Sequence, residues 1–351
     1  MDLQTVTAED YPEYSSAVST PPAKINKAKR RRRRGRLRCM LGFLIFAGLL
    51  AATRLSNLWL AFDVLSHFTL HFAVLAAAFL IGYFMPVGRV LTAFVLALIG
   101  FAGIGSYAHY ASEKPRIFGL AQANERPLRI MSFNSGFAND NTEAIIQEVH
   151  RIDPDVAVLI ELSEGKRVVV QQLRDKYPYH IDCIGTPYCH LAILSKAPIT
   201  SSESKGLWSG PALIRASLGG QYAGVHVVGV HSIRTPYIRA QFGQMRELAN
   251  YLNAFAGPLF VVGDFNATPF ARVLGLFAER TSLRRVTSLP TWPGHVELPQ
   301  LAIDHIFLSS GVRVLEQAKI GQRAGSDHYP VTTLVSVPVN QSKVINSERQ
   351  F

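Results

Sequence analysis

Cysteine is scarce in this sequence, with 3 residues among 351. The chain therefore has room for one internal disulfide at most, which excludes a small scaffold held together by several such bonds. Cys39 opens an apolar run, where a thiol behaves as a small hydrophobic residue. Cys183 and Cys189 bracket the turn-like segment IGTPY, so they suit a disulfide across a hairpin in an oxidising compartment. Two free thiols in a cytoplasmic domain are the alternative.

Acidic residues are also few, 25 against 36 Lys and Arg, which leaves a formal net charge of +11. The excess is local, because residues 24–38 (KINKAKRRRRRGRLR) hold ten of the basic residues, whereas the chain from Ser112 onward has 24 basic and 20 acidic ones. This near balance argues against tight binding of nucleic acid by the later part of the chain. No internal repeat and no base-reading signature is present, and the arginine run is the only low-complexity segment.

Three apolar runs follow the basic segment, at residues 39–53, 64–85 and 90–110. A membrane-spanning helix needs about 20 mostly apolar residues, a length that the second and third runs reach. The first run stops at Arg54, so it spans only if this arginine reaches the interface or if the run continues through LSNLWLAF. We expect about three spans. Two spans, a cleaved signal peptide and a twin-arginine signal are the alternatives, and the two later runs favour an uncleaved anchor.

The arginine cluster also predicts an orientation, because basic residues beside a span stay in the cytoplasm. Three spans then place everything after residue 110 on the other side, which in a bacterium is the periplasm or the exterior. We expect a multi-pass protein of the bacterial inner (cell) membrane. Its predicted parts are a disordered basic tail (1–38), a transmembrane region (39–110), a linker (111–126), one globular domain (127–338) and a flexible tail (339–351).

Residues 127–338 alternate short strand-like runs with a few amphipathic helical patches. Many strands and few helices predict an α/β domain in which helices cover two packed sheets. The helix expected last has Pro269 in its first turn. Strands are predicted at 128–133, 156–160, 190–195, 212–218, 223–230, 259–262, 303–308, 312–319 and 330–336, and helices at 141–151, 163–176, 237–255 and 268–279.

Polar side chains follow or begin several of these strands. They are Asn134, Glu161, His231, Asp264, Asn266, Asp304, Asp327 and His328. Because strand residues alternate between faces, we expect Asp264 and Asn266 to share one face while Phe265 packs on the other.

Carboxylates at the ends of buried strands are costly unless something compensates their charge. A divalent cation is the natural compensator, and carboxylate, amide and water oxygens favour Mg²⁺, with Mn²⁺ or Ca²⁺ possible, over zinc. Two histidines remain for proton transfer and for stabilising negative charge. This set predicts metal-assisted hydrolysis of a phosphate ester.

The motifs MSFN, LIEL, GVHS, GDFNATP, TWP, IDHIFLS and SDHYPV occur in this order. Together they resemble the endonuclease/exonuclease/phosphatase superfamily, which includes DNase I-like nucleases, abasic-site endonucleases, sphingomyelinases and inositol-polyphosphate phosphatases. The resemblance covers residues 127–337 and implies a four-layer αββα sandwich. The membrane-anchored layout is similar to a bacterial branch of the superfamily.

The resemblance also implies roles for single residues. Metal binding falls to Glu161, to Asn134 beside it and to Asp327. Asp264 and Asn266 match the pair that orients the attacking water and holds the phosphate. His328 matches the histidine that contacts phosphate or acts as a base, and Asp304 the aspartate that orients it. His231 matches the first catalytic histidine, where abasic-site endonucleases commonly have tyrosine. Arg234 and Trp292 are candidate substrate contacts.

We therefore expect a membrane-anchored, Mg²⁺-dependent phosphoesterase that hydrolyses phosphodiester bonds through water attack assisted by a His–Asp pair. The candidate substrates are nucleic acid and phospholipid of the sphingomyelin type, and the membrane tether favours the lipid. A catalytically inactive membrane scaffold or sensor is the alternative from another functional class. The lipid bilayer is an expected partner, and the sequence implies no protein partner.

Overall fold

The computed structural model describes residues 22–86 and 88–338. The flexible tail predicted at 339–351 lies outside the described residues, as does the first part of the tail predicted at 1–38. Residues 22–38 form the beginning of a long helix, which corrects the expectation of disorder there. The segment is rich in Lys, Arg and Ala, which are strong helix formers, and it continues directly into the apolar run.

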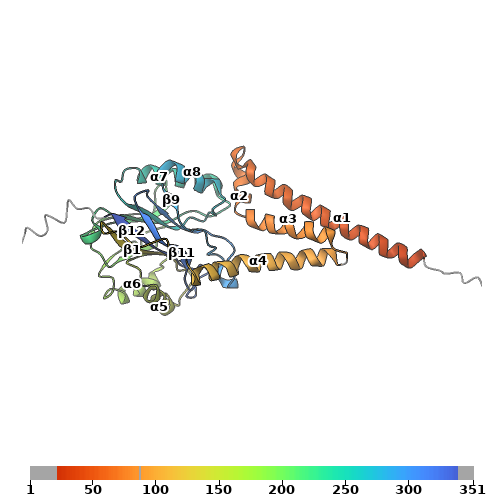
Figure 1. The fold of residues 1–351 in the computed structure, drawn as a ribbon. Helices are drawn as coiled ribbons and strands as arrows, with labels where there is room; N and C mark the ends of the chain where they lie inside the picture. The colour runs from red at the N-terminus through yellow and green to blue at the C-terminus, as the bar shows by residue number, and fades with distance from the viewer. Residues whose placement is uncertain (1–21, 87, 339–351) are drawn as a thin grey trace, which may run out of the picture.

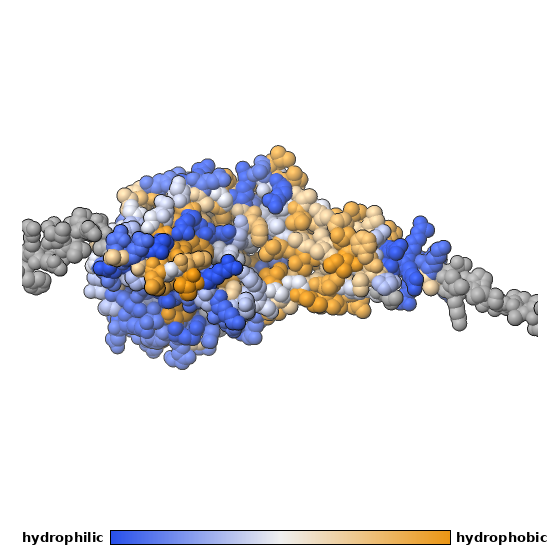
Figure 2. All heavy atoms as spheres, viewed as in Figure 1, coloured by the Kyte–Doolittle hydropathy of each residue, from blue (hydrophilic) through white to orange (hydrophobic). Residues whose placement is uncertain are grey.

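The N-terminal part consists of three long helices that lie side by side and extend from a globular domain (Figure 1). They are α1 (Pro22–Ala52), α3 (Thr69–Phe84) and α4 (Arg89–Glu113), and the short turns η1 (Thr53–Asn57), η2 (Leu60–Phe62) and α2 (Asp63–Ser66) join the first two. Figure 2 shows an apolar band over these helices, between a hydrophilic cluster at the outer end of α1 and the domain.

Two of the helical stretches, Lys27–Asn57 and Arg89–Glu113, are long and apolar enough to cross a membrane. The middle pass is less regular, because Leu60–Ser66 and Thr69–Phe84 meet at a bend of 64°. The α3 helix has 16 residues, which span about 24 Å at 1.5 Å per residue. This falls short of the hydrocarbon core of about 30 Å, so α3 needs the segment before it to complete a pass.

The globular domain is a four-layer αββα sandwich, as expected. The first sheet has the strand order β11-β12-β1-β2-β4-β3 and the second has the order β5-β6-β7-β8-β10-β9. The strands of the first sheet are β1 (Glu125–Asn134), β2 (Val156–Ile160), β3 (Tyr179–Asp182), β4 (Leu191–Ser195), β11 (Arg313–Ile320) and β12 (Val331–Pro338). Those of the second are β5 (Ile199–Lys205), β6 (Ala212–Leu218), β7 (His226–His231), β8 (Leu259–Asp264), β9 (Arg284–Arg285) and β10 (Asp304–Leu308).

Helices cover the outer face of each sheet (Figure 1). The pair α5 (Thr142–Ile152) and α6 (Arg167–Gln172) packs on the first sheet, and α7 (Ile238–Leu252) with α8 (Arg272–Thr281) packs on the second. The largest apolar core lies between the two sheets, where residues such as Ile193, Ile214 and Ile306 are fully or almost fully buried. This rigid double layer fixes the strand ends from which the site is built.

Three details of the fold differ from the sequence predictions. The helix expected at 163–176 is reduced to the turn η3 (Glu164–Lys166) and the short α6. The last helix begins at Arg272 rather than near Pro269, because the Asp63 carboxylate accepts hydrogen bonds from the amides of Arg272 and Val273 and so caps it. Strands β3, β5 and β9 were not expected, since edge strands such as β5 (ITSSESK) are largely polar.

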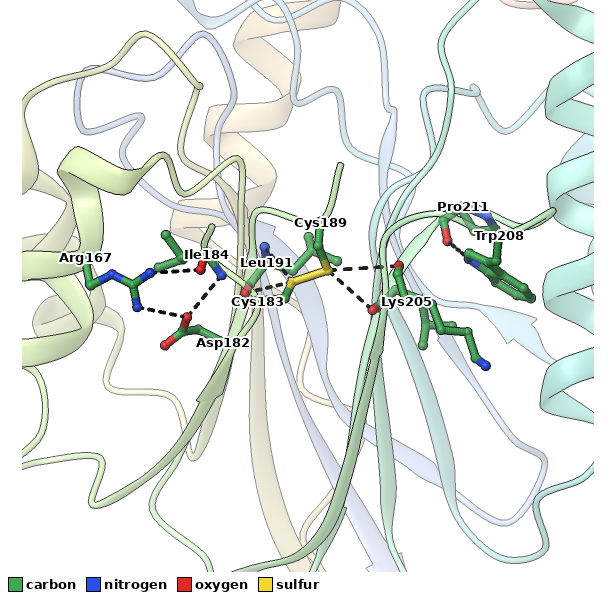
Figure 3. The surroundings of a disulfide bond; sticks show 10 residues. Arg167, Asp182, Cys183, Ile184, Cys189, Leu191, Lys205, Trp208 and Pro211 are labelled. Carbon is green, nitrogen blue, oxygen red and sulfur yellow. Dashed lines mark hydrogen bonds and ion pairs between the residues drawn. A yellow bond between two sulfur atoms is a disulfide. The ribbon is translucent and has the colours of Figure 1, made fainter. Parts of the chain in front are cut away.

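The disulfide expected between Cys183 and Cys189 is present, with a sulfur–sulfur distance of 2.11 Å (Figure 3). It closes the loop between β3 and β4, and both cysteines belong to the core between the sheets. The Arg167 side chain donates a hydrogen bond to the Ile184 carbonyl in the same loop. The loop therefore joins the core to the segment that follows Glu161.

Candidate active site

The polar strand ends predicted from the sequence converge at one edge of the sandwich. In the second sheet Asp264 on β8 lies opposite His231 on β7 and opposite Asp304 on β10. The first sheet contributes Asn134 at the end of β1, and Glu161 directly after β2. Strand pairing within each sheet and the packing of one sheet on the other bring these side chains together, as in the hydrogen bond between Asn134 and Asp264.

One cluster consists of Glu161, His231 and Asp264. The Glu161 Oε1 atom lies 3.5 Å from His231 Nε2, which lies 3.8 Å from Asp264 Oδ2. The second oxygen of Glu161 accepts a hydrogen bond of 2.6 Å from the Phe137 amide, which orients the carboxylate. One potential ligand atom from each residue lies within 4.8 Å of the others, and two of the three residues are carboxylates that repel each other without a cation. These residues fit a divalent metal ion.

A second cluster consists of Asp304 and His328. The Asp304 Oδ2 atom lies 2.8 Å from His328 Nδ1 and accepts a further hydrogen bond of 2.6 Å from the Thr291 hydroxyl. Because Asp304 holds Nδ1, the Nε2 atom of His328 is directed toward Asp264, whose Oδ2 lies 3.9 Å away. This arrangement fixes which nitrogen of His328 faces the cleft.

Burial and the charges of neighbouring groups set the protonation of Asp264 and His328. Burial and the neighbouring Asp304 carboxylate raise the pKa of Asp264 to about 6, against the opposing effect of the two histidines. Burial alone would lower the pKa of His328, but the charge and hydrogen bond of Asp304, with Asp264 and Asp327 beside it, raise that pKa to about 10. His328 is therefore a cation at neutral pH.

The two asparagines hold Asp264 in place. The Asn134 amide donates to Asp264 Oδ2 over 3.0 Å, while its oxygen accepts from the Gly136 amide. Asn266 has a φ of 47°, the left-handed region, and its backbone amide donates to Asp264 Oδ1. The shared face of Asp264 and Asn266 thus results from a turn after the strand and not from strand alternation. Phe265 packs in the core of the second sheet, as expected.

The remaining predicted residues line a cleft of about 800 Å³ above these clusters. Arg234 and Trp292 are part of its wall, together with Asp327. The Trp292 indole donates to Asp327 Oδ2 over 3.1 Å, and Asp327 is exposed, unlike Asp264 and Asp304. The structure therefore places all eight polar residues predicted from the strand ends, and both candidate substrate contacts, in or directly beneath one cleft.

Other residues of the site were missed from the sequence. Lys166 is buried, and its ammonium group donates to the Ser135 hydroxyl and to the carbonyls of Gly136 and Glu161. Burial lowers the pKa of Lys166 to about 8. The lysine ties together the two loops that carry Asn134 and Glu161. In the sequence, the only indication of this role is that Lys166 lies five residues after Glu161, within a segment predicted to be helical.

The wall of the cleft also includes His67 and Phe68, from the junction between α2 and α3. The Thr268 amide donates to His67 Nδ1 over 3.2 Å, just after the Asp264–Asn266 turn. In the sequence this junction falls within the predicted transmembrane region, because contacts between distant segments leave no local pattern.

The model of the Endonuclease/Exonuclease/phosphatase family matches residues 131–328. The chain belongs to this family. Enzymes of the endonuclease/exonuclease/phosphatase family hydrolyse phosphate esters with divalent metal ions, and the matched range includes every clustered residue described above. No curated protein matches the chain.

Solved structures show the same fold at low sequence identity. An endonuclease/exonuclease/phosphatase family protein from Bacteroides thetaiotaomicron is 15% identical with a TM-score of 0.51, over 62% of this chain and 97% of that one. Sphingomyelinase C from Streptomyces griseocarneus is 16% identical with a TM-score of 0.48, over 60% and 99%. The human nocturnin catalytic domain is 17% identical with a TM-score of 0.49, over 64% and 98%.

Proposed function

We propose that this protein is a membrane-anchored, divalent-metal-dependent phosphodiesterase. The observation that carries the proposal is the convergence of Glu161, His231 and Asp264 with the Asp304–His328 pair under one cleft. A catalytically inactive scaffold would have no need to keep both clusters complete. The roles assigned below are our proposal for this arrangement.

Glu161 would hold the metal ion, and His231 and Asp264 lie beside this position. The ion is Mg²⁺ in the first place, with Mn²⁺ or Ca²⁺ possible, and it would supply positive charge to the phosphate and to an attacking water. Asn134 orients Asp264 through the hydrogen bond described above, and the exposed Asp327 remains available to a second ion or to the substrate.

Individual side chains carry out proton transfer, charge stabilisation and substrate binding. The Asp264 carboxylate accepts the proton of the attacking water, while the Asn266 amide stands beside it to hold a phosphate oxygen. The protonated His328 stabilises the negative charge that develops on the phosphate, because Asp304 fixes its orientation. His231, beside Glu161 and Asp264, contributes a second imidazole, and Arg234 and Trp292 contact the rest of the substrate.

The test is a panel of plasmid DNA, sphingomyelin and bis-p-nitrophenyl phosphate, assayed with the full-length protein and added Mg²⁺. We expect turnover of at least one substrate, its loss on chelation of the metal, and a fall of about 100-fold or more in Asp264→Ala and His328→Ala. Asp175→Ala is the matched control, since Asp175 is exposed and does not line the cleft. Folded protein that hydrolyses none of the three substrates would refute the proposal.

We also propose that the catalytic domain lies in the periplasm or exterior of a bacterial cell. Support comes from the hydrophilic outer end of α1, which lies across the apolar band from the domain (Figure 2). The disulfide between Cys183 and Cys189 suits an oxidising compartment.

A further inference from the structure

A second cavity of about 580 Å³ lies between the membrane helices and the catalytic domain. We call it the helix–domain chamber. One wall is formed by α3 and α4, with Leu70, Gly103 and Ile104, and the opposite wall by the domain, with Phe270, Pro290 and Leu301. Its volume falls within the range of about 300–1,000 Å³ that is typical of small-ligand sites.

The chamber adjoins the catalytic cleft. His67 and Leu301 line both cavities, so the two cavities are direct neighbours. The chamber wall also includes Thr268 and Pro269, which directly follow the Asp264–Asn266 turn. A group bound there therefore lies close to whatever is bound beside the Asp264–Asn266 turn.

The walls of the chamber combine apolar surface with a few polar atoms. Within the described residues, Arg285 Nη1, Gln300 Oε1 and Thr268 Oγ1 are buried without a hydrogen-bond partner, and all three residues line the chamber. Buried polar atoms are costly unless a ligand or water satisfies them. A donor and an acceptor beside an apolar wall match the ester, amide or hydroxyl groups that join a lipid headgroup to its chains.

We propose that the substrate is a lipid phosphodiester whose hydrocarbon chain occupies the helix–domain chamber while its phosphate occupies the cleft. The inference rests on the phosphodiesterase function proposed above and specifies its substrate class. The chamber wall is made by membrane helices, so the chain enters from the hydrocarbon region that surrounds them. A nucleic acid has no apolar group of this size, and its use of the cleft would leave the chamber unused.

Gly103 offers a direct way to fill the chamber. It lines the cavity, and a Cβ built on it meets no atom within 4 Å, so Gly103→Phe places a ring in open space. Gly48 on α1 has equally open surroundings and does not line the chamber, so Gly48→Phe is the matched control.

The experiment compares octyl and ethyl p-nitrophenyl phosphate, which share the reacting centre and the leaving group. The full-length protein is held in an amphipathic polymer with Mg²⁺. We expect Gly103→Phe to lower kcat/KM for the octyl ester about tenfold or more, since each methylene excluded from an apolar site changes an equilibrium about fourfold. Activity on the ethyl ester stays unchanged, which shows that the variant is folded, and Gly48→Phe changes neither.

An equal effect of Gly103→Phe on both esters, or no effect on the octyl ester, would overturn the inference. Binding is read separately by photocrosslinking with an octyl ester that carries a diazirine at the chain end. Labels on α3, on α4 and on residues 268–271 support the chamber even if no ester is hydrolysed, in which case only the proposed function fails. Turnover of the ethyl ester with labels confined to α1 refutes the chamber and leaves the function intact.

Discussion

Asp304 shows how much a single hydrogen bond decides in this site. It lies opposite Asp264 on the neighbouring strand, and its Oδ2 atom lies 2.8 Å from His328 Nδ1 and accepts a hydrogen bond from the Thr291 hydroxyl. We therefore regard it as a positioning residue. Asp304→Asn keeps the shape but places a neutral amide against the imidazole, so that the negative charge which favours the protonated form of His328 is lost.

We predict that Asp304→Asn lowers kcat on bis-p-nitrophenyl phosphate by about 100-fold or more with little change in KM, because the charged imidazole acts mainly in the transition state. Steady-state kinetics measures this split. Thr291→Val removes the second hydrogen bond to the Asp304 carboxylate, and with it two long bonds of 3.4 Å from the Ile303 and Asp304 amides, but leaves the bond to His328, so it should cost less than Asp304→Asn. A large rise in KM with unchanged kcat would contradict the assignment.

His305, next to Asp304, has a structural role of a different kind. Its side chain is buried, with Nε2 at 2.8 Å from the Ala267 carbonyl and Nδ1 at 3.1 Å from the Thr287 hydroxyl. Burial lowers its pKa to about 3, with Arg285 adding to the effect. The folded state therefore holds this imidazole neutral, whereas the unfolded chain binds a proton near its ordinary pKa of about 6.5.

The protein should consequently lose stability in acid. The contribution of His305 is complete above about pH 6.5 and is lost toward pH 3, by about 1.4 kcal/mol per pH unit, because the unfolded state binds the proton first. Thermal unfolding at pH 7 and pH 5 measures the loss. His305→Gln removes the titrating group, so its unfolding temperature should fall less between these pH values than that of the wild type. An equal fall in both proteins would contradict this origin.

At the level of elements, the junction between α1 and α3 acts as part of the catalytic domain. The Asp63 carboxylate accepts from the amides of Arg272 and Val273 at the start of α8, 209 and 210 positions away. Arg272 in turn donates to the Ser56 carbonyl. On α4, a Cβ on Gly105 would lie 2.8 Å from the Leu298 Cα atom, so helix and domain are in close contact there too.

We predict that Asp63→Ala destabilises α8 by about 0.5–2 kcal/mol, the cost of losing a helix N-cap. Hydrogen exchange of the Arg272 and Val273 amides should accelerate, and kcat/KM should fall because α8 follows the Asp264–Asn266 turn. Asp63→Asn keeps an acceptor and should retain most of the protection. Unchanged exchange in Asp63→Ala would show that the cap does not hold α8.

The strand ends of the site could be predicted from the sequence, whereas the start of α8 and the role of Lys166 could not. The strand ends with Asn134, Glu161, His231 and Asp264 were predictable, because an apolar run that stops at a polar residue is a local pattern. The alternation rule also placed Phe265 in the core. The start of α8 was not predictable, because its cap comes from Asp63 in another part of the chain, and Lys166 was missed because burial of a lone cation leaves no trace in spacing.

On the scale of the whole molecule, the direction of the helices decides on which side of a membrane the site would lie. The α1 helix leads from its hydrophilic outer end toward the domain, α3 leads away, and α4 returns to β11 and the rest of the sandwich (Figure 1). Three passes would place the arginine cluster and the active site on opposite sides of a membrane. Two passes, with α3 held at the surface, would leave both on one side.

Fusions of alkaline phosphatase and of green fluorescent protein distinguish these two arrangements in bacteria. Alkaline phosphatase is active after export, whereas green fluorescent protein is bright in the cytoplasm. For three passes, with the basic end inside, we predict active phosphatase after Asn57 and after Phe351, and bright fluorescence after Met85. For two passes, the fusion at Phe351 would fluoresce instead. That result would place the catalytic domain in the cytoplasm, and Cys183 and Cys189 in a reducing compartment. The cleft and the helix–domain chamber would then face the lipids of the inner leaflet.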